Sequence, residues 1–256
     1  MVVSITHFLF LICVFLCSVH ALKPLIVETG TALEPIRDRY LDLADWFYLA
    51  LNINIEDVEI VRVYLGEDLP AHDPSRVVII TGSWGMVTDH EPWSENTAKW
   101  IQSGILIDAP MIGVCYGHQL MAYALGGTID FFPESREIGK LSIRKTANGL
   151  VDSFMASFPD EFDVLLCHSQ RVITIPDGAV VLAESEMDPH QIIRYSKHAI
   201  SVQFHPEFFS DLLRFIVEIY RDDLQAERFD IDELLTSIQE TPDSRKLLID
   251  FVQPYL

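Results

Sequence analysis

The chain has 256 residues, of which 49% are hydrophobic, so it is long enough for one sizeable core or for one domain with an appendage. Its 38 Asp and Glu residues outnumber its 18 Lys and Arg residues, which gives a formal net charge of -20 at pH 7. Such a surplus of acid repels phosphate backbones and anionic membrane surfaces, so we expect no nucleic-acid partner.

The N-terminal segment, residues 1–22, is apolar. Its run "FLFLICVFLC" is followed by small residues at Val19 and Ala21, where signal peptidases prefer them. The run is too short for a stable membrane span, and no Lys or Arg precedes Lys23, so the positive region of a signal peptide is missing. Three interpretations stay open: a signal peptide, a start assigned too far upstream, and a first helix that docks on the body.

The four cysteines bear on the compartment. Cys13 and Cys17 lie in the apolar segment, which leaves only Cys115 and Cys167 in the body. Two cysteines do not make a disulfide framework, so we predict a cytoplasmic protein, or a secreted or periplasmic one if residues 1–21 are a signal peptide. No Cys or His cluster has metal-ligand spacing and no phosphate-binding loop is present, so we expect neither a metal nor a cofactor.

From residue 23 onward, short β-rich runs alternate with helical patterns. Continuous apolar runs suit strands that are covered on both faces, and alternation with helices predicts a mostly parallel central sheet. An apolar stripe from Pro35 to Leu51 predicts one helix. The expected strands lie at 23–30, 58–65, 76–82, 109–115, 163–169 and 199–204, and two further helices at 93–104 and 117–127.

The rest of the chain departs from this alternation. Residues 126–149 predict shorter, antiparallel strands. After residues 205–221, the last residues predict two helices that are separated at Thr241–Pro242. We therefore expect an α/β fold with a small antiparallel section. Its catalytic domain would span 23–222 and its helical C-terminal extension 223–256.

The sequence "GVCYG" places Cys115 where a strand should end and a helix begin. Gly-x-Cys-x-Gly is the cysteine counterpart of the nucleophile elbow, a sharp turn that holds a reactive atom above the sheet. The positive end of the following helix dipole would stabilise a thiolate, and the amide of Tyr116 could stabilise an oxyanion. Cys115 is therefore a candidate nucleophile, whereas Cys167 has no glycine frame and is expected in the core.

A thiol nucleophile needs a base and a group that orients the base. "VQFHPEF" offers both, since His205 follows an apolar strand and Pro206 disfavours helix at the residue before it. Residues two apart on extended chain face the same side, so Glu207 could reach the imidazole and fix its tautomer.

Together, "GVCYGHQ" and "VQFHPE", about ninety positions apart, resemble the class I glutamine amidotransferases. The resemblance implies a flavodoxin-like fold with a Cys115–His205–Glu207 triad. In this family the cysteine attacks the γ-amide of glutamine, forms a γ-glutamyl thioester and releases ammonia and then glutamate. "SREIG" around Glu137 is similar to the stand-alone, guanylate-synthetase-like branch.

The resemblance also implies the rest of the site. The loop "TGSWG" would supply Gly82 and a second oxyanion donor, the backbone amide of Ser83, although Ser-Trp stands where the family commonly has Gly-Pro. The remaining substrate-binding candidates are Gln119, His168, Ser169 and Gln170. For His168, a purely structural role is an equal alternative.

Three functions remain open. The first is a glutaminase of the amidotransferase type, either an independent hydrolase or the partner of a separate synthase subunit that accepts ammonia. The second is a γ-glutamyl peptidase that cleaves glutathione-like γ-glutamyl compounds. The third is a binding or regulatory module without catalysis, and the intact triad argues against it.

Overall fold

A computed structural model describes residues 22–133 and 135–256. The apolar run, Cys13, Cys17 and all but the last residue of the predicted N-terminal segment lie outside these ranges. Among the described helices, none is both long and apolar enough to cross a bilayer.

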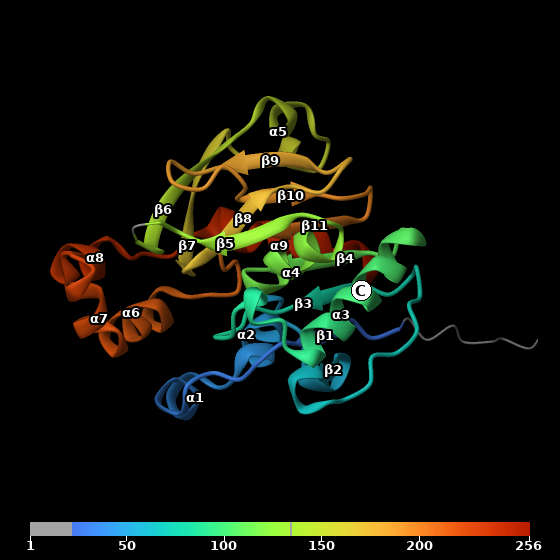
Figure 1. The fold of residues 1–256 in the computed structure, drawn as a ribbon, viewed down its shortest axis with the longest axis horizontal. Coiled ribbons are helices and arrows are strands. Elements are labelled where there is room, and N and C mark those ends of the chain that lie inside the picture. The colour runs from blue at the N-terminus through green and yellow to red at the C-terminus, as the bar shows by residue number, and fades with distance from the viewer. Residues whose placement is uncertain (1–21, 134) are drawn as a thin grey trace, which may run out of the picture.

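A nine-stranded mixed sheet forms the centre of the described chain (Figure 1). Its order is β2-β1-β3-β4-β11-β10-β9-β6-β7, and the pairs from β2 to β11 are parallel. The other four strands pair in antiparallel fashion, and β5 and β8 form a separate two-stranded sheet. The strands are β1 (Leu25–Glu28), β2 (Glu59–Arg62), β3 (Val78–Ile80), β4 (Met111–Val114), β5 (Thr128–Phe131), β6 (Glu137–Lys145), β7 (Glu161–His168), β8 (Gln170–Thr174), β9 (Val180–Glu184), β10 (Ile192–Arg194) and β11 (Ala199–Val202).

Helices cover both faces of the parallel part. Ile26 of β1 packs in one core cluster with residues of α2 and α9, whereas Leu25 and Val27 pack in another with residues of α3 and α4. Because alternate residues of a strand face opposite sides, this two-sided burial explains the continuous apolar runs. The helices are α1 (Glu34–Tyr40), α2 (Leu43–Ala50), α3 (Pro92–Leu106), α4 (Tyr116–Ala124), α5 (Ala147–Val151), α6 (Ser210–Ile219), α7 (Arg221–Ala226), α8 (Ile231–Ser237) and α9 (Pro242–Val252).

The predicted fold class is confirmed: a mixed sheet with a parallel core, flanking helices and antiparallel strands. The antiparallel section is larger than expected, because β10, β9, β6 and β7 extend the central sheet instead of standing apart from it.

The prediction of one helix from Pro35 to Leu51 is wrong. The chain breaks into α1 and α2 at Leu41, which has a φ of 68°. Asp42 then caps α2 and accepts a hydrogen bond from the Leu43 amide at 2.9 Å. Its carboxylate also accepts one from the Ala32 amide at 2.7 Å, so a contact from ten residues upstream overrides the helical stripe.

The chain after α6 contains three helices, one more than predicted. Pro242 occupies the first turn of α9, as expected for a proline. Helix α8 contacts β6 and α9 contacts β7, while α7 begins at Arg221, ahead of the predicted boundary at 222/223. Figure 1 shows α6, α7 and α8 gathered at one end of the molecule, near α1. The C-terminal helices therefore pack on the sheet and on neighbouring helices.

Replacing the cap residue should destabilise the protein. Asp42→Ala removes the acceptor for two backbone amides, and an N-cap change typically costs about 0.5–2 kcal/mol of unfolding free energy. We expect the free energy of unfolding, measured by urea denaturation, to fall by about 2 kcal/mol, because the segment at Ala32 is released as well. Asp38→Ala, at an exposed position on α1, is the control and should stay within about 0.5 kcal/mol of the parent. An equal loss in both variants would contradict the capping role.

Candidate active site

Cys115 lies at the sharp turn between β4 and α4. Its backbone has a φ of 51° and a ψ of -98°, a strained conformation for a residue with a side chain. A Cβ on Gly113 would lie 2.5 Å from the Gly117 carbonyl oxygen, and one on Gly117 would lie 2.4 Å from the Ile80 carbonyl oxygen. Both glycines are thus required by close backbone contacts, and the predicted elbow geometry is present.

His205 lies three residues after β11. Its Nδ1 is 2.7 Å from Glu207 Oε1, and both side chains are buried. The chain between them turns rather than staying extended, since the Phe208 amide donates to the His205 carbonyl at 3.2 Å. The imidazole also stacks on the Phe208 ring, with centroids 3.9 Å apart and planes 11° apart. The predicted contact between His205 and Glu207 is therefore present, but a turn, and not an extended chain, brings the two side chains together.

Cys115 and His205 both lie next to Gly82. The position of a Cβ on Gly82 would be 3.1 Å from His205 Cε1 and 3.7 Å from Cys115 Cβ. Burial lowers the pKa of His205, but the neighbouring Glu207 carboxylate and the Cys115 sulfur outweigh it and raise that pKa to about 10. The imidazole is therefore protonated at neutral pH.

All ten predicted site residues line one cavity of about 280 Å³. Its size is close to that of small-molecule sites. Besides the three residues of the predicted triad, the predicted site residues that line it are Gly82, Ser83, Tyr116, Gln119, His168, Ser169 and Gln170.

Two backbone amides are available for an oxyanion. Tyr116 is the first residue of α4, so its N–H has no partner within the helix. Within residues 22–133 and 135–256, neither this N–H nor that of Ser83 finds a hydrogen-bond acceptor. The Ser83 hydroxyl accepts from the Gly85 amide at 3.0 Å and so stabilises the turn of the loop.

The amide side chain of Gln119 is already partly engaged. Its Nε2 donates to the Gln170 carbonyl at 2.7 Å and to Gln203 Oε1 at 3.1 Å, which leaves its oxygen for a ligand. Gln170 in turn accepts from the Val87 amide at 3.2 Å and donates to Thr88. Gln170 thus ties the turn between β7 and β8 to the loop after β3.

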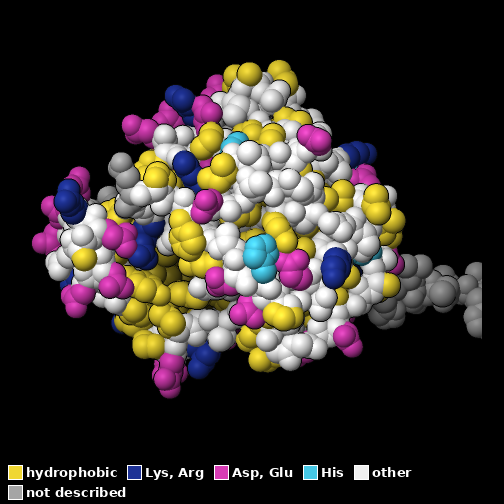
Figure 2. All heavy atoms as spheres, in the orientation of Figure 1, with side chains coloured by type: hydrophobic (Ala, Val, Ile, Leu, Met, Phe, Trp, Pro, Cys, Tyr) yellow, Lys and Arg dark blue, Asp and Glu magenta, His cyan; other side chains and the backbone are white. Residues whose placement is uncertain are grey.

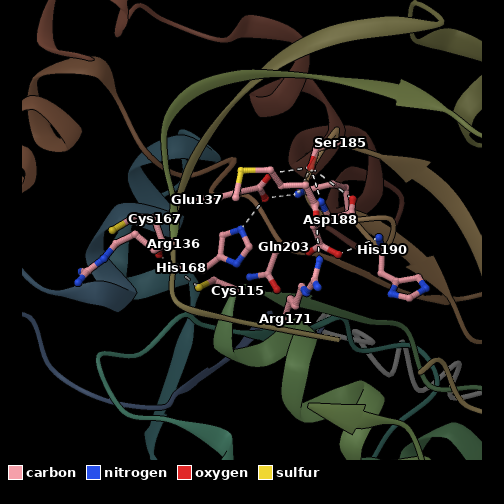
Figure 3. A network of polar contacts seen from close by, with 12 residues as sticks. Cys115, Arg136, Glu137, Cys167, His168, Arg171, Ser185, Asp188, His190 and Gln203 are labelled. Atoms are coloured by element: carbon pink, nitrogen blue, oxygen red, sulfur yellow. Dashed lines mark hydrogen bonds and ion pairs between the residues drawn. The ribbon is translucent and has the colours of Figure 1, made fainter. Parts of the chain in front are cut away.

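His168 lines the cavity, and its side chain also contacts Glu137 in a buried polar network (Figure 3). Its Nδ1 is 2.8 Å from the Gln170 carbonyl oxygen and its Nε2 is 2.9 Å from Glu137 Oε2. Burial raises the pKa of Glu137, but hydrogen bonds from His168, Ser185 and Gln191 outweigh it and lower that pKa. Both ring nitrogens of His168 are therefore held by protein groups.

Glu137, His168 and Asp188 each place one atom that could bind a metal within 4.8 Å of the others. Glu137 already accepts hydrogen bonds from three donors, so we interpret this group as a buried hydrogen-bond network. The sequence did not predict this network, since its members lie on β6, β7 and the loop before β10.

The cavity has a second wall that the sequence analysis missed. It is largely aromatic, and it adjoins a hollow lined by hydrophobic side chains that Figure 2 shows between α2 and the helices α6–α8. Only Trp84, in "TGSWG", and Arg136, in "SREIG", belong to motifs noted in the sequence, and neither was assigned a role. The residues of this wall come from α2, the loop after β3, the segment before β6 and the end of α6. They are Leu43, Trp46, Phe47, Trp84, Met86, Arg136 and Tyr220.

Comparison with known proteins agrees with this architecture. A family model for class-I glutamine amidotransferases matches residues 50–214. A glutamine amidotransferase structure from Thermotoga maritima superimposes with a TM-score of 0.72 and 22% identity, over 92% of this chain and 99% of that one. The chain therefore belongs to the class-I glutamine amidotransferase family.

The curated relatives include larger proteins. A glutamine-hydrolysing GMP synthase of Gloeobacter violaceus is 31% identical over 193 residues, which are 72% of this chain and 33% of that protein. A glutamine amidotransferase-like protein of Schizosaccharomyces pombe is 25% identical over 179 residues, 69% of this chain and 70% of that one. This chain thus spans about a third or less of the length of the GMP synthases that it matches.

The Glu207 carboxylate should make stability depend on pH through His205. A histidine in the unfolded chain has a pKa of about 6.5, whereas the pKa of His205 in the fold is raised to about 10. Its contribution to the unfolding free energy is therefore complete below the unfolded pKa and is lost as pH rises through the folded pKa. In Glu207→Gln, the decline in stability between about pH 6.5 and about pH 10 should be smaller.

Urea denaturation at several pH values measures this slope, and NMR of the imidazole gives the pKa directly. Glu56→Gln, at an exposed position, is the matched control and should keep the parent slope. Equal slopes in the parent and in Glu207→Gln would contradict the assigned ion pair.

Proposed function

We propose that this protein hydrolyses the γ-amide of glutamine, with Cys115 as nucleophile, His205 as acid and base, and Glu207 as the group that orients His205. The main support is the arrangement of these three groups. A strained cysteine at a helix N-terminus faces an imidazole whose Nδ1 is held by a buried carboxylate at 2.7 Å. This combination suits a nucleophile, a proton carrier and an orienting group.

In the first half of the reaction, the Cys115 thiolate attacks the γ-carbonyl carbon and forms a C–S bond. The protonated His205 favours the thiolate, and it then gives a proton to the leaving nitrogen as the C–N bond breaks. The amides of Tyr116 and Ser83 stabilise the oxyanion between these events. The products are ammonia and a γ-glutamyl thioester.

In the second half, water attacks the thioester. Neutral His205 accepts a proton from that water, the C–S bond breaks, and glutamate leaves. Glu207 accepts a hydrogen bond from Nδ1 throughout, so Nε2 stays directed at the reacting atoms. Gln119 and the Ser169–Gln170 turn lie in the same cavity and are suited to hold the amino-acid end of the substrate.

We further propose that the released ammonia passes to a separate synthase subunit. The support is the likeness to the glutamine-hydrolysing GMP synthases, of which this chain matches only one part. A partner of this kind would bind where the cavity opens, so that ammonia is not lost to solvent.

Cys115→Ala should abolish release of glutamate from glutamine. Alanine keeps the Cβ, so the elbow and the unfolding free energy should be retained while the nucleophile is lost. Glutamate release measures turnover and circular dichroism verifies the fold. Residual turnover at the parent rate would exclude Cys115 as the nucleophile.

A diazoketone analogue of glutamine should label Cys115 and not Cys167. Burial, together with the nearby Cys115 sulfur, raises the pKa of the Cys167 thiol to about 12, so Cys167 is almost entirely in its unreactive form. Mass spectrometry of the digested protein identifies the labelled residue. Label on Cys167 alone would contradict the proposal.

His205→Asn should lower kcat for glutamine by at least about 10²–10⁴-fold, the usual contribution of a general acid or base. Asparagine fits the site but does not carry a proton between steps. The matched control is His90→Asn, since His90 is exposed and bonds only to Glu95 on the surface. Similar kcat values for the two variants would contradict the role of His205.

A further inference from the structure

The chemistry fixes where the leaving group must lie. His205 gives its proton to the departing nitrogen, so any substituent on that nitrogen lies on the His205 side of the cavity. Ammonia has no substituent and needs no such space. The shape of the protein next to His205 therefore bears on which amides the site accepts.

An aromatic wall continues from the His205 ring. Phe208 stacks on this ring, and the Trp46 ring lies 5.5 Å from Phe208 in an edge-to-face arrangement. The Trp84 ring follows at 6.3 Å from Trp46, and its indole N–H donates to the Tyr220 hydroxyl at 2.9 Å. The side chains of these residues and of His205 all line the cavity. We call Phe208, Trp46, Trp84 and Tyr220 the aromatic wall.

An ion pair lies at the far edge of the aromatic wall and brings no net charge to the cavity. Arg136 also lines the cavity and forms a two-point ion pair with Glu227, which directly follows α7. The guanidinium carbon lies 5.9 Å from the centre of the Tyr220 ring. Because Glu227 matches the charge of Arg136, the wall is suited to an uncharged, apolar group.

We propose that the aromatic wall is a subsite for the leaving group, and that the site accepts γ-glutamyl amides whose amine carries a large apolar or aromatic side chain. This inference rests on the proposed Cys115 chemistry and extends it to a substrate class. Aromatic rings pack edge-to-face or in offset stacks and bury large areas, so they suit such a group.

The reaction keeps the same balance of atoms with this substrate. The Cys115 sulfur forms the thioester as the C–N bond breaks, and the amine leaves with the proton from His205. Water then releases glutamate and returns a proton to His205. The only difference is that the amine carries its side chain away from the aromatic wall.

The chain after α6 positions part of this subsite. Tyr220 is the last position before α7, and Glu227 directly follows α7, so this short helix fixes both residues at the edge of the cavity. Packing of Leu224 in the core between them holds α7 in place.

The test compares three substrates with the purified full chain: γ-glutamyl-phenylalanine, γ-glutamyl-glycine and glutamine. Both dipeptides carry the same carboxylate and differ only in the benzyl group, so their comparison isolates the aromatic wall. We expect kcat/KM for the phenylalanine dipeptide to exceed that for the glycine dipeptide by about tenfold or more, as burial of a large apolar group allows.

Tyr220→Ala should lower the ratio of kcat/KM for γ-glutamyl-phenylalanine to that for glutamine. The ratio does not depend on the fraction of folded protein, so partial unfolding cannot imitate the effect. Leu106→Ala, at a position on α3 that is 86% exposed, is the matched control and should keep the ratio.

The outcomes separate the two proposals. Hydrolysis of glutamine without a preference for the phenylalanine dipeptide would overturn the subsite and leave the proposed function standing. So would a preference that Tyr220→Ala does not reduce. If none of the three substrates is hydrolysed and the diazoketone does not label Cys115, both proposals are wrong.

Discussion

The parallel pairing of β4 with β11 is the constraint on which the site depends. Val114 is paired with Val202, and the Cys115 amide donates to the Val202 carbonyl at 2.9 Å, so the ladder extends to the nucleophile candidate. Cys115 and His205 follow these neighbouring strands at the same edge of the sheet, although about ninety residues separate them. Because side chains alternate between faces, a slip of one residue would turn the two groups apart.

The sequence was informative where a function needs a local backbone geometry. Backbone lies so close to Gly113 and Gly117 that no residue with a side chain fits at either position. The five-residue motif "GVCYG" was therefore enough to predict a sharp turn. Apolar runs covered on two faces likewise predicted the parallel strands. The spacing of His205 and Glu207 predicted their contact correctly, although a turn rather than a strand brings them together.

Features that depend on distant contacts could not be predicted. The break between α1 and α2 follows from a bond between Asp42 and Ala32, and no periodicity records such a bond. Glu137 meets His168 because β6 pairs with β7 in one register, which the sequence did not specify. Tyr220 reaches the cavity through the packing of α6 and α7. In each case the partner comes from another element, so the signal is absent from the local sequence.

Two buried histidines in one cavity show why contacts, and not residue type, distinguish a candidate base. His168 uses Nδ1 on the Gln170 carbonyl and Nε2 on Glu137, so it has no nitrogen left for a substrate. His205 contacts Glu207 through Nδ1, which leaves its Nε2 for the proposed proton transfer. A base must release and recover a proton within one turnover, and an imidazole held at both nitrogens cannot do so without breaking a buried hydrogen bond. His168 is instead suited to a positioning role, because its contact with the Gln170 carbonyl holds the turn that lines the cavity.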